Sequence, residues 1–208
     1  MKLYTYFRSS AAYRARIALN LKGVPYEPVP VNLLKGEQRE EAYRSINPQK
    51  RLPALDIGGT VLIQSPAILE YLDEVYPEPP LLPGDAVNRA KVRAVASLVG
   101  CDIHPLNNLG PLTYLKKTLG HEQAAVDAWY AHWVREGFEA IEGLIGPGPY
   151  CFGPQVTLAD VYLVPQVFNA RRFNISLDAY PKIVAVDAAC TELRAFQDAA
   201  PDRQPDAV

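Results

Sequence analysis

The sequence predicts two domains of different class, an α/β domain followed by an all-helical domain. Over the first eighty residues, strand-like and helix-like segments alternate, which is typical of an α/β domain. A proline-dense stretch, YPEPPLLPGD at residues 76–85, then interrupts the pattern and reads as a linker. Beyond it, apolar residues recur at helical spacing. We therefore expect an α/β domain over residues 1–80 and an all-helical domain over residues 86–208.

The first domain opens with a predicted strand and helix. Residues 2–7, KLYTYF, are rich in β-forming side chains. Residues 11–22 then show helical spacing of apolar side chains, and Gly23 stands where a C-terminal cap is favoured. Ser9 and Ser10 precede this helix, and serine is a preferred N-cap residue. The sequence thus places two hydroxyl groups at a helix N-terminus.

A second strand, a hairpin and a second helix complete the predicted α/β domain. Residues 27–34, EPVPVNLL, alternate in polarity, and their prolines suit an edge strand. The Gly58-Gly59 step between two apolar runs predicts a hairpin. Ser65 then caps a helix that Pro66 opens, because proline is tolerated best in the first helical turn.

The second domain carries several helix signals. Residues 86–101 and 122–145 place apolar side chains at helical spacing. Thr157 and Asp160 have the spacing of a capping box, so a helix is expected to begin there. Residues 201–208, PDRQPDAV, are predicted to be a loose tail.

Composition and charge exclude several classes of protein. The 208 residues include 21 Lys and Arg against 23 Asp and Glu, a net charge of −2 that argues against a nucleic-acid partner. No apolar run is long enough to span a bilayer, and the first residues lack the apolar core of a signal peptide. The three cysteines, Cys101, Cys151 and Cys190, form neither a CxxC pair nor a zinc-ligand spacing. We expect a cytoplasmic protein with three buried free thiols, no metal site and no membrane partner.

Four segments together resemble the zeta class of the glutathione transferases. In chain order they are SSAAYRARIAL at residues 9–19, NPQKRLPAL at 47–55, QSPAILEYL at 64–72 and ADVYLVPQV at 159–167. The resemblance implies the glutathione transferase fold, with a thioredoxin-like glutathione-binding domain before the helical domain. It also implies glutathione as the cofactor and a homodimer.

The activity implied by this resemblance is a glutathione-dependent cis–trans isomerisation in aromatic compound catabolism. The class includes maleylacetoacetate isomerase, so the expected reaction converts 4-maleylacetoacetate to its fumaryl isomer without consuming glutathione. Three alternatives stay open: maleylpyruvate isomerisation in the gentisate pathway, general conjugation of small electrophiles, and glutathione binding without catalysis. Residues 99–108, VGCDIHPLNN, resemble the maleylpyruvate branch. Ala11 stands where the class commonly has cysteine, which disfavours thiol–disulfide exchange.

The segment after the first predicted strand has the residues needed to activate the thiol of a bound glutathione. A hydroxyl donor, a helix N-terminus and a nearby cation each lower a thiol pKa, which is otherwise about 8.5. We expect Ser9 to be the partner of the thiolate, with Ser10 as second choice, although a plain N-cap role is the alternative. Arg8 is expected at the site and on a substrate carboxylate. Arg14 and Arg16 are expected in structural ion pairs or in solvent.

The resemblance also implies which residues of the first domain bind glutathione. Pro53 would follow a cis peptide bond, so that the Leu52 main chain pairs with the cysteinyl amide. Gln64 and Ser65 would hold the γ-glutamyl carboxylate at a helix N-terminus. Gln38, and with it Lys50 or Arg51, would contact the glycyl end.

Residues of the second domain are expected to complete the site. The resemblance assigns glutathione contacts to His104 and Asn108, and Pro105 is expected to kink a helix beside them. It assigns a substrate carboxylate to Arg172. A surface ion pair is the competing expectation for Arg171.

Overall fold

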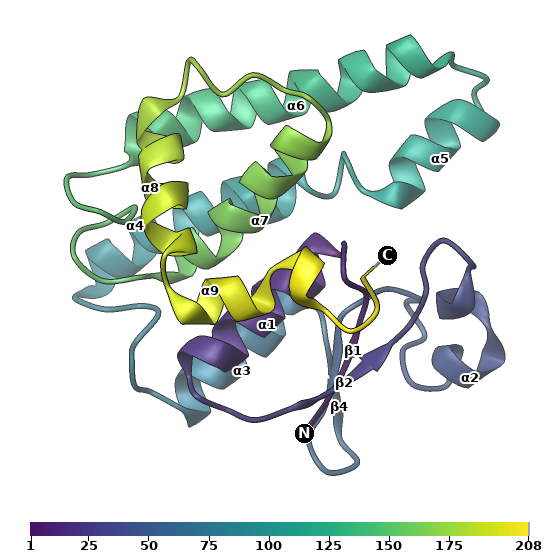
Figure 1. Ribbon diagram of the computed structural model, residues 1–208, viewed down its shortest axis with the longest axis horizontal. Helices are drawn as coiled ribbons and strands as arrows, with labels where there is room; N and C mark the ends of the chain where they lie inside the picture. Colours follow the sequence, from purple (N-terminus) through teal and green to yellow (C-terminus); the bar gives the residue numbers. More distant parts are fainter. Residues whose placement is uncertain (208) are drawn as a thin grey trace. The chain divides into compact units, whose positions relative to one another are not determined.

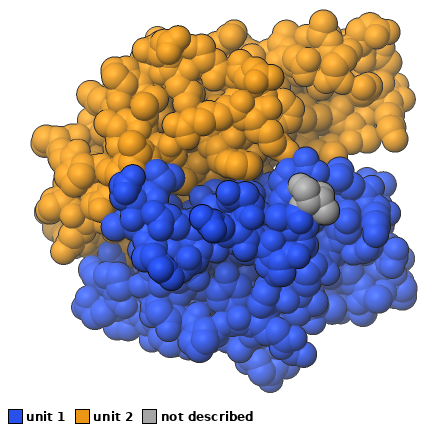
Figure 2. Space-filling view, viewed as in Figure 1, with its two compact units in different colours: residues 1–80, 191–208 blue, residues 81–190 orange. Residues whose placement is uncertain are grey.

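A computed structural model describes residues 1–207 and divides the chain into two compact units. The first unit comprises residues 1–80 together with the described residues from 191 onward, and the second comprises residues 81–190 (Figure 2). The sequence places the C-terminal segment in the helical domain, whereas in the structure this segment packs with the first unit. An α/β sheet domain and a helical domain are present, as predicted.

The first unit is built on a four-stranded mixed sheet. β1 and β2 are parallel neighbours joined through a helix, and the other pairs are antiparallel, in the order β2-β1-β3-β4. β2 lies at the edge, as its prolines predict. Gly58 and Gly59 have left-handed φ values of 79° and 99° in the predicted hairpin between β3 and β4. The strands are β1 (Lys2–Thr5), β2 (Glu27–Pro30), β3 (Ala54–Asp56) and β4 (Val61–Ile63).

Helices of the first unit begin close to where the sequence predicts. α1 starts at Ser10 with Ser9 as its N-cap. α3 begins at Ser65 itself, so the prediction of Ser65 as the cap is wrong by one residue, and Gln64 is the cap. The helices are α1 (Ser10–Leu21), α2 (Glu41–Arg44), α3 (Ser65–Val75) and α9 (Arg194–Ala199), with short 3₁₀ turns at Glu37–Arg39 and Pro201–Arg203.

The C-terminal segment packs against the rest of the first unit as far as residue 207, so the prediction of a loose tail is wrong for residues 201–207. Val208 lies outside the described residues. α9 packs along α1, as Figure 1 shows in yellow and purple. After α9, the buried Gln204 side chain donates to the carbonyls of Asp198 and Ala200 at 3.0 and 2.9 Å. Ala207 then packs against the apolar cluster that includes Tyr6. These long-range contacts replace the solvent exposure that the polar composition suggested.

The named secondary-structure elements of the second unit, residues 81–190, are all helices. α7 is its central element, because most of its side chains are buried and both members of the Thr157–Asp160 capping box are formed. The helix expected to kink at Pro105 instead ends in a π-helical segment, and a new helix starts after Asn108. The helices are α4 (Ala86–Ser97), the π-helical η2 (Leu98–Ile103), α5 (Leu109–Lys117), α6 (Gln123–Leu144), α7 (Leu158–Arg172) and α8 (Pro181–Thr191).

The cysteines agree with the prediction in two of three cases. Cys151 and Cys190 are buried free thiols, and burial raises the pKa of both. Cys101 is free but exposed, because it lies on the outer side of the π-helical segment, so its predicted burial is wrong. Within residues 1–207, no helix is long and apolar enough to cross a membrane.

Candidate functional site

Strand register brings three predicted site segments together at one end of the sheet. Ala54, at the start of β3, pairs with Tyr4 near the end of β1 and with Ile63 at the end of β4. The chain segments that continue past these strand ends therefore start side by side. They hold the pairs Arg8 and Ser9, Leu52 and Pro53, and Gln64 and Ser65.

Ser9 combines an N-cap with a free proton donor. Its Oγ accepts a hydrogen bond from the Ala12 N–H at 3.3 Å, which satisfies one N–H of the first turn of α1. That bond uses an oxygen lone pair, so the hydroxyl hydrogen can still be donated to a ligand. Ser10 is only 6% exposed, whereas Ser9 is half-buried. The geometry favours Ser9 as the hydroxyl that faces a ligand.

Arg8 is half-buried beside the same turn. Its Nη2 donates to the Tyr6 hydroxyl at 3.3 Å, and its guanidinium lies 4.8 Å from the centre of the Phe7 ring. These contacts orient the cation next to Ser9 and leave it donors for an anion.

Arg16 is fully buried beneath the turn between β1 and α1, and Arg14 is 2% exposed, so solvent is excluded for both. Solvent exposure, one of the two expected roles, is wrong for Arg16, and its hydrogen-bond partners are main-chain oxygens and one hydroxyl rather than a carboxylate. Burial lowers its pKa to about 10, so the guanidinium stays charged at neutral pH. It donates to Thr5 Oγ1 (3.0 Å) and to the carbonyls of Tyr6 (3.4 Å), Phe7 (3.0 Å) and Ala199 (2.9 Å).

The Leu52–Pro53 peptide bond is cis, as predicted. Tyr43 Oη and Asn47 Nδ2 each donate to the Arg51 carbonyl at 2.7 Å, and burial raises the pKa of the Tyr43 hydroxyl. Both residues hold the turn in front of Leu52, and sequence reasoning missed them. Within the described part of the chain, no main-chain hydrogen bond uses Leu52, which leaves its N–H and C=O for a ligand.

Three further features fit a peptide-like ligand with terminal carboxylates. Gln64 has a strained φ of 71°, and its Nε2 donates to Gln49 Oε1 at 2.7 Å. Ser65 begins α3, whose first amides form an anion site. Gln38 is 5% exposed, and its Oε1 has no hydrogen-bond partner among the described residues. Together with the Leu52 main chain, these groups fit glutathione.

His104 and Asn108 lie in the second unit, around the turn between η2 and α5. His104 is half-buried. Asn108 is the N-cap of α5, with its Oδ1 accepting from the Leu109 N–H at 2.8 Å. The neighbouring Asn107, which the sequence analysis did not select, is buried and donates to the Tyr130 carbonyl at 3.1 Å. A capping role and a ligand role remain compatible for Asn108, since its side-chain N–H groups are not used by that cap.

Arg171 and Arg172 differ in their surroundings. Arg171 forms an ion pair with the buried Asp187, which is the competing role expected for it. Arg172 is exposed, and its guanidinium lies 4.8 Å from the centre of the Phe173 ring. Burial raises the pKa of the nearby Tyr130 to about 12, and the positive charge of Arg172 opposes that rise. Of the two arginines, Arg171 is therefore engaged by Asp187, and Arg172 is the exposed one.

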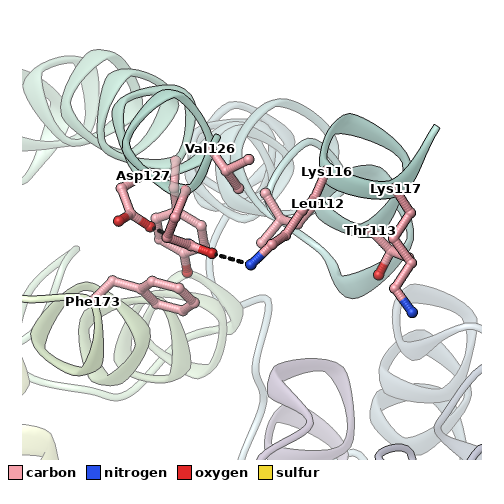
Figure 3. Close-up of a pocket in the computed structure, with 9 residues that line it drawn as sticks. Leu112, Thr113, Lys116, Lys117, Val126, Asp127 and Phe173 are labelled. Carbon is pink, nitrogen blue, oxygen red and sulfur yellow. Dashed lines mark hydrogen bonds between the residues drawn. The ribbon is translucent and has the colours of Figure 1, made fainter. Parts of the chain in front are cut away.

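A cavity of about 170 Å³ lies in the second unit next to Phe173 (Figure 3). Phe173 stacks on Tyr130 with ring centres 3.9 Å apart, and both rings line the cavity. Lys116 Nζ donates to Gln123 Oε1 at 2.7 Å, and both of these residues also line the cavity. The other lining residues are Leu112, Thr113, Lys117, Val126 and Asp127.

Comparisons with known proteins agree with this architecture. The glutathione S-transferase N-terminal and C-terminal domain families match residues 1–74 and 123–196. A solved maleylpyruvate isomerase, described as a bacterial zeta-class glutathione transferase, is 56% identical with a TM-score of 0.98, covering 100% of both chains. The maleylacetoacetate isomerase of Pseudomonas aeruginosa is 53% identical over 99% of this chain and 98% of its own. A maleylacetoacetate isomerase from Methylobacterium extorquens AM1, solved with bound malonate and glutathione, is 37% identical with a TM-score of 0.96, also covering 100% of both chains. The chain therefore belongs to the zeta class of the glutathione transferases.

Proposed function

We propose that this protein is a glutathione-dependent cis–trans isomerase that converts a maleyl diketo acid, 4-maleylacetoacetate, to its fumaryl isomer. The observation that carries the proposal is the meeting of Ser9, the N-terminus of α1 and Arg8 at one sheet end, beside the Leu52–Pro53 turn. All three cysteines lie in the second unit, so the first unit has no thiol of its own. When bound, glutathione would supply the thiol whose addition converts the substrate double bond to a single bond that can rotate, and whose departure restores the double bond.

The residues of the first unit bind and activate that thiol. Ser9 donates its hydroxyl hydrogen to the thiolate while its oxygen keeps the cap on α1. The α1 N-terminus and Arg8 favour the negative charge further. The Leu52 main chain pairs with the peptide part of the ligand as an added strand does.

Other polar groups bind the γ-glutamyl and glycyl ends of glutathione. Gln64 and the first amides of α3, starting at Ser65, hold the γ-glutamyl carboxylate. Gln38 Oε1 accepts a hydrogen bond from the glycyl N–H. The family resemblance supports His104 and Asn108 as further glutathione contacts.

The substrate is a dicarboxylate, and we assign its carboxylates to two arginines. Arg8 is held by Tyr6 and Phe7 with donors to spare, and Arg172 is exposed beside Phe173. A guanidinium binds a carboxylate with two parallel hydrogen bonds, which gives orientation as well as affinity. The related Methylobacterium enzyme binds a small dicarboxylate, malonate, together with glutathione.

Maleylpyruvate is the second candidate substrate. The 56% identity and TM-score of 0.98 to a maleylpyruvate isomerase favour it specifically. The two substrates share the maleyl group that isomerises, so the same site residues serve both reactions. Conjugation of small electrophiles is the activity from a different class, and it differs in consuming glutathione.

The experiment is isomerisation of 4-maleylacetoacetate and maleylpyruvate in parallel, each with and without glutathione, with product absorbance and free thiol followed together. We expect turnover that requires glutathione at constant free thiol, and the ratio of kcat/KM values identifies the substrate. Thiol loss equal to product formed would instead identify a conjugating transferase. No turnover of either acid would reject the isomerase assignment.

We also propose a cytoplasmic homodimer. The family resemblance supports the dimer, and three free thiols suit a reducing compartment. Light scattering on a size-exclusion column tests the first statement, since a monomer at working concentration contradicts it. Fractionation of cells that express the protein tests the second.

A further inference from the structure

Two charged side chains bind the main chain of Phe7: one binds its N–H and the other binds its carbonyl. The Phe7 N–H donates to Asp206 Oδ2 at 3.0 Å. The Phe7 carbonyl accepts from Arg16 Nη2 at 3.0 Å. Phe7 directly precedes Arg8 and Ser9, so this clamp sets the position from which both site residues extend.

The segment that contains Asp206 is fixed by its own hydrogen bonds and by packing. The buried Gln204 side chain bonds to two carbonyls at the end of α9, and the Ala207 N–H donates to the Gln204 carbonyl at 3.0 Å. Ala207 packs on the cluster that contains Tyr6 and Phe7. Arg16 joins the two segments, because it also donates to the Ala199 carbonyl at the end of α9.

Asp206 and Arg16 also interact electrostatically. The negative charge of Asp206 favours the protonated form of Arg16, and this opposes the lowering of the Arg16 pKa by burial. The second carboxylate oxygen of Asp206, Oδ1, is buried and has no hydrogen-bond partner among residues 1–207. Leaving a buried acceptor unsatisfied costs free energy, so the Phe7 N–H is the partner that fixes this carboxylate.

We propose that Asp206 and Arg16 are positioning residues that clamp Phe7 and thereby fix Arg8 and Ser9 for glutathione activation. The clamp makes the C-terminal segment part of the working site, because Asp206 acts on the site through Phe7. The inference rests on the proposed role of Ser9 as the thiolate partner.

A competing electrostatic role for Asp206 predicts a shift of opposite sign. If Asp206 acted through its charge, its removal would lower the pKa of the bound thiol, because a nearby anion opposes a second negative charge. If Asp206 acts by holding Phe7, its removal lets Ser9 move away from the sulfur and raises that pKa.

The test compares three variants of the full-length protein. Asp206→Ala removes the acceptor, whereas Asp206→Asn removes the charge but keeps an amide oxygen that can accept from the Phe7 N–H. Asp202→Ala is the matched control, because Asp202 is an exposed acid in the same segment. The thiol of glutathione bound to each variant is titrated by thiolate absorbance without substrate, and kcat and KM are then measured across pH.

We expect Asp206→Ala to raise the bound thiol pKa by about one unit and to lower kcat/KM at pH 7 about five- to tenfold, with recovery at higher pH. Asp206→Asn and Asp202→Ala should stay within about twofold of the wild-type protein. A lower thiol pKa in both Asp206 variants, or an unchanged pKa with only reduced thermal stability, would overturn the clamp. A wild-type protein that does not lower the glutathione pKa would instead reject the proposed function itself, so the two failures are distinguishable.

Discussion

Replacing Ser9 separates the two roles that the structure gives its hydroxyl group. The oxygen caps α1 through Ala12 at 3.3 Å, and the hydrogen is assigned to the glutathione thiolate. Ser9→Ala removes both roles. Ser9→Gly removes the hydroxyl but keeps a residue that N-cap positions tolerate well, and Ser9→Thr keeps both roles.

The expected magnitudes follow from the bonds that each variant loses. Loss of a serine cap costs about 1 kcal/mol in Ser9→Ala, and only a few tenths in Ser9→Gly. For a chain of this size, about 1 kcal/mol lowers Tm by roughly 2–4 °C. A hydrogen bond to a charged sulfur contributes about 1.5–3 kcal/mol, equivalent to one to two pKa units. Both variants should therefore raise the bound thiol pKa by about one to two units and lower kcat/KM at pH 7 by about 10- to 100-fold.

The assay combines thiolate absorbance of the glutathione complex, isomerase kinetics and thermal unfolding. We expect Ser9→Ala and Ser9→Gly to share the catalytic defect while only Ser9→Ala loses stability, and Ser9→Thr to retain activity. Ser10→Ala is the companion variant, because Ser10 is the other hydroxyl at this helix start. A normal thiol titration in Ser9→Ala together with a shifted one in Ser10→Ala would refute the assignment and transfer the role to Ser10.

Further predictions concern the substrate, the pH dependence and the core. Arg172→Ala should raise KM for the dicarboxylate about tenfold or more while KM for glutathione stays unchanged, because a bidentate charge-assisted pair is lost. Steady-state kinetics check this, and equal rises in both KM values would contradict it. Burial raises the pKa of Asp187, so the folded state binds the carboxyl proton more tightly than the unfolded state does. The free energy of unfolding should therefore fall as pH rises through the raised pKa. Urea unfolding between pH 4 and 7 should show this fall in the wild-type protein and a weaker fall in Asp187→Asn. Gly137→Ala places a Cβ 2.3 Å from a side-chain atom of buried Ile103, so it should lower the free energy of unfolding by about 1–3 kcal/mol. Gly143→Ala on the same helix meets nothing within 4 Å, so it should raise the free energy of unfolding by up to about 1 kcal/mol. Thermal unfolding of both variants checks this.

Short-range signals carried most of the local structure. The Gly58-Gly59 hairpin, the Thr157–Asp160 capping box and the serine start of α1 depend on residues within a few positions of each other, so they are legible in the sequence. The order of strands and helices follows from the same signals. The resemblance then added the family and the cis bond before Pro53, which no local pattern would have indicated.

Long-range packing decided the rest of the site. The partners of Arg16 and Asp206 lie up to 183 and 199 positions away, and no local periodicity or spacing encodes such pairs. An arginine on a helix is usually solvated, so only the tertiary fold reveals that Arg16 is buried among carbonyls that need a donor. Likewise the polar segment 201–207 reads as a loose tail, until the fold supplies the Phe7 N–H and an apolar cluster for it to bind. Local propensities depend on neighbouring residues, whereas burial and hydrogen-bond partners depend on which distant surfaces the folded chain brings together.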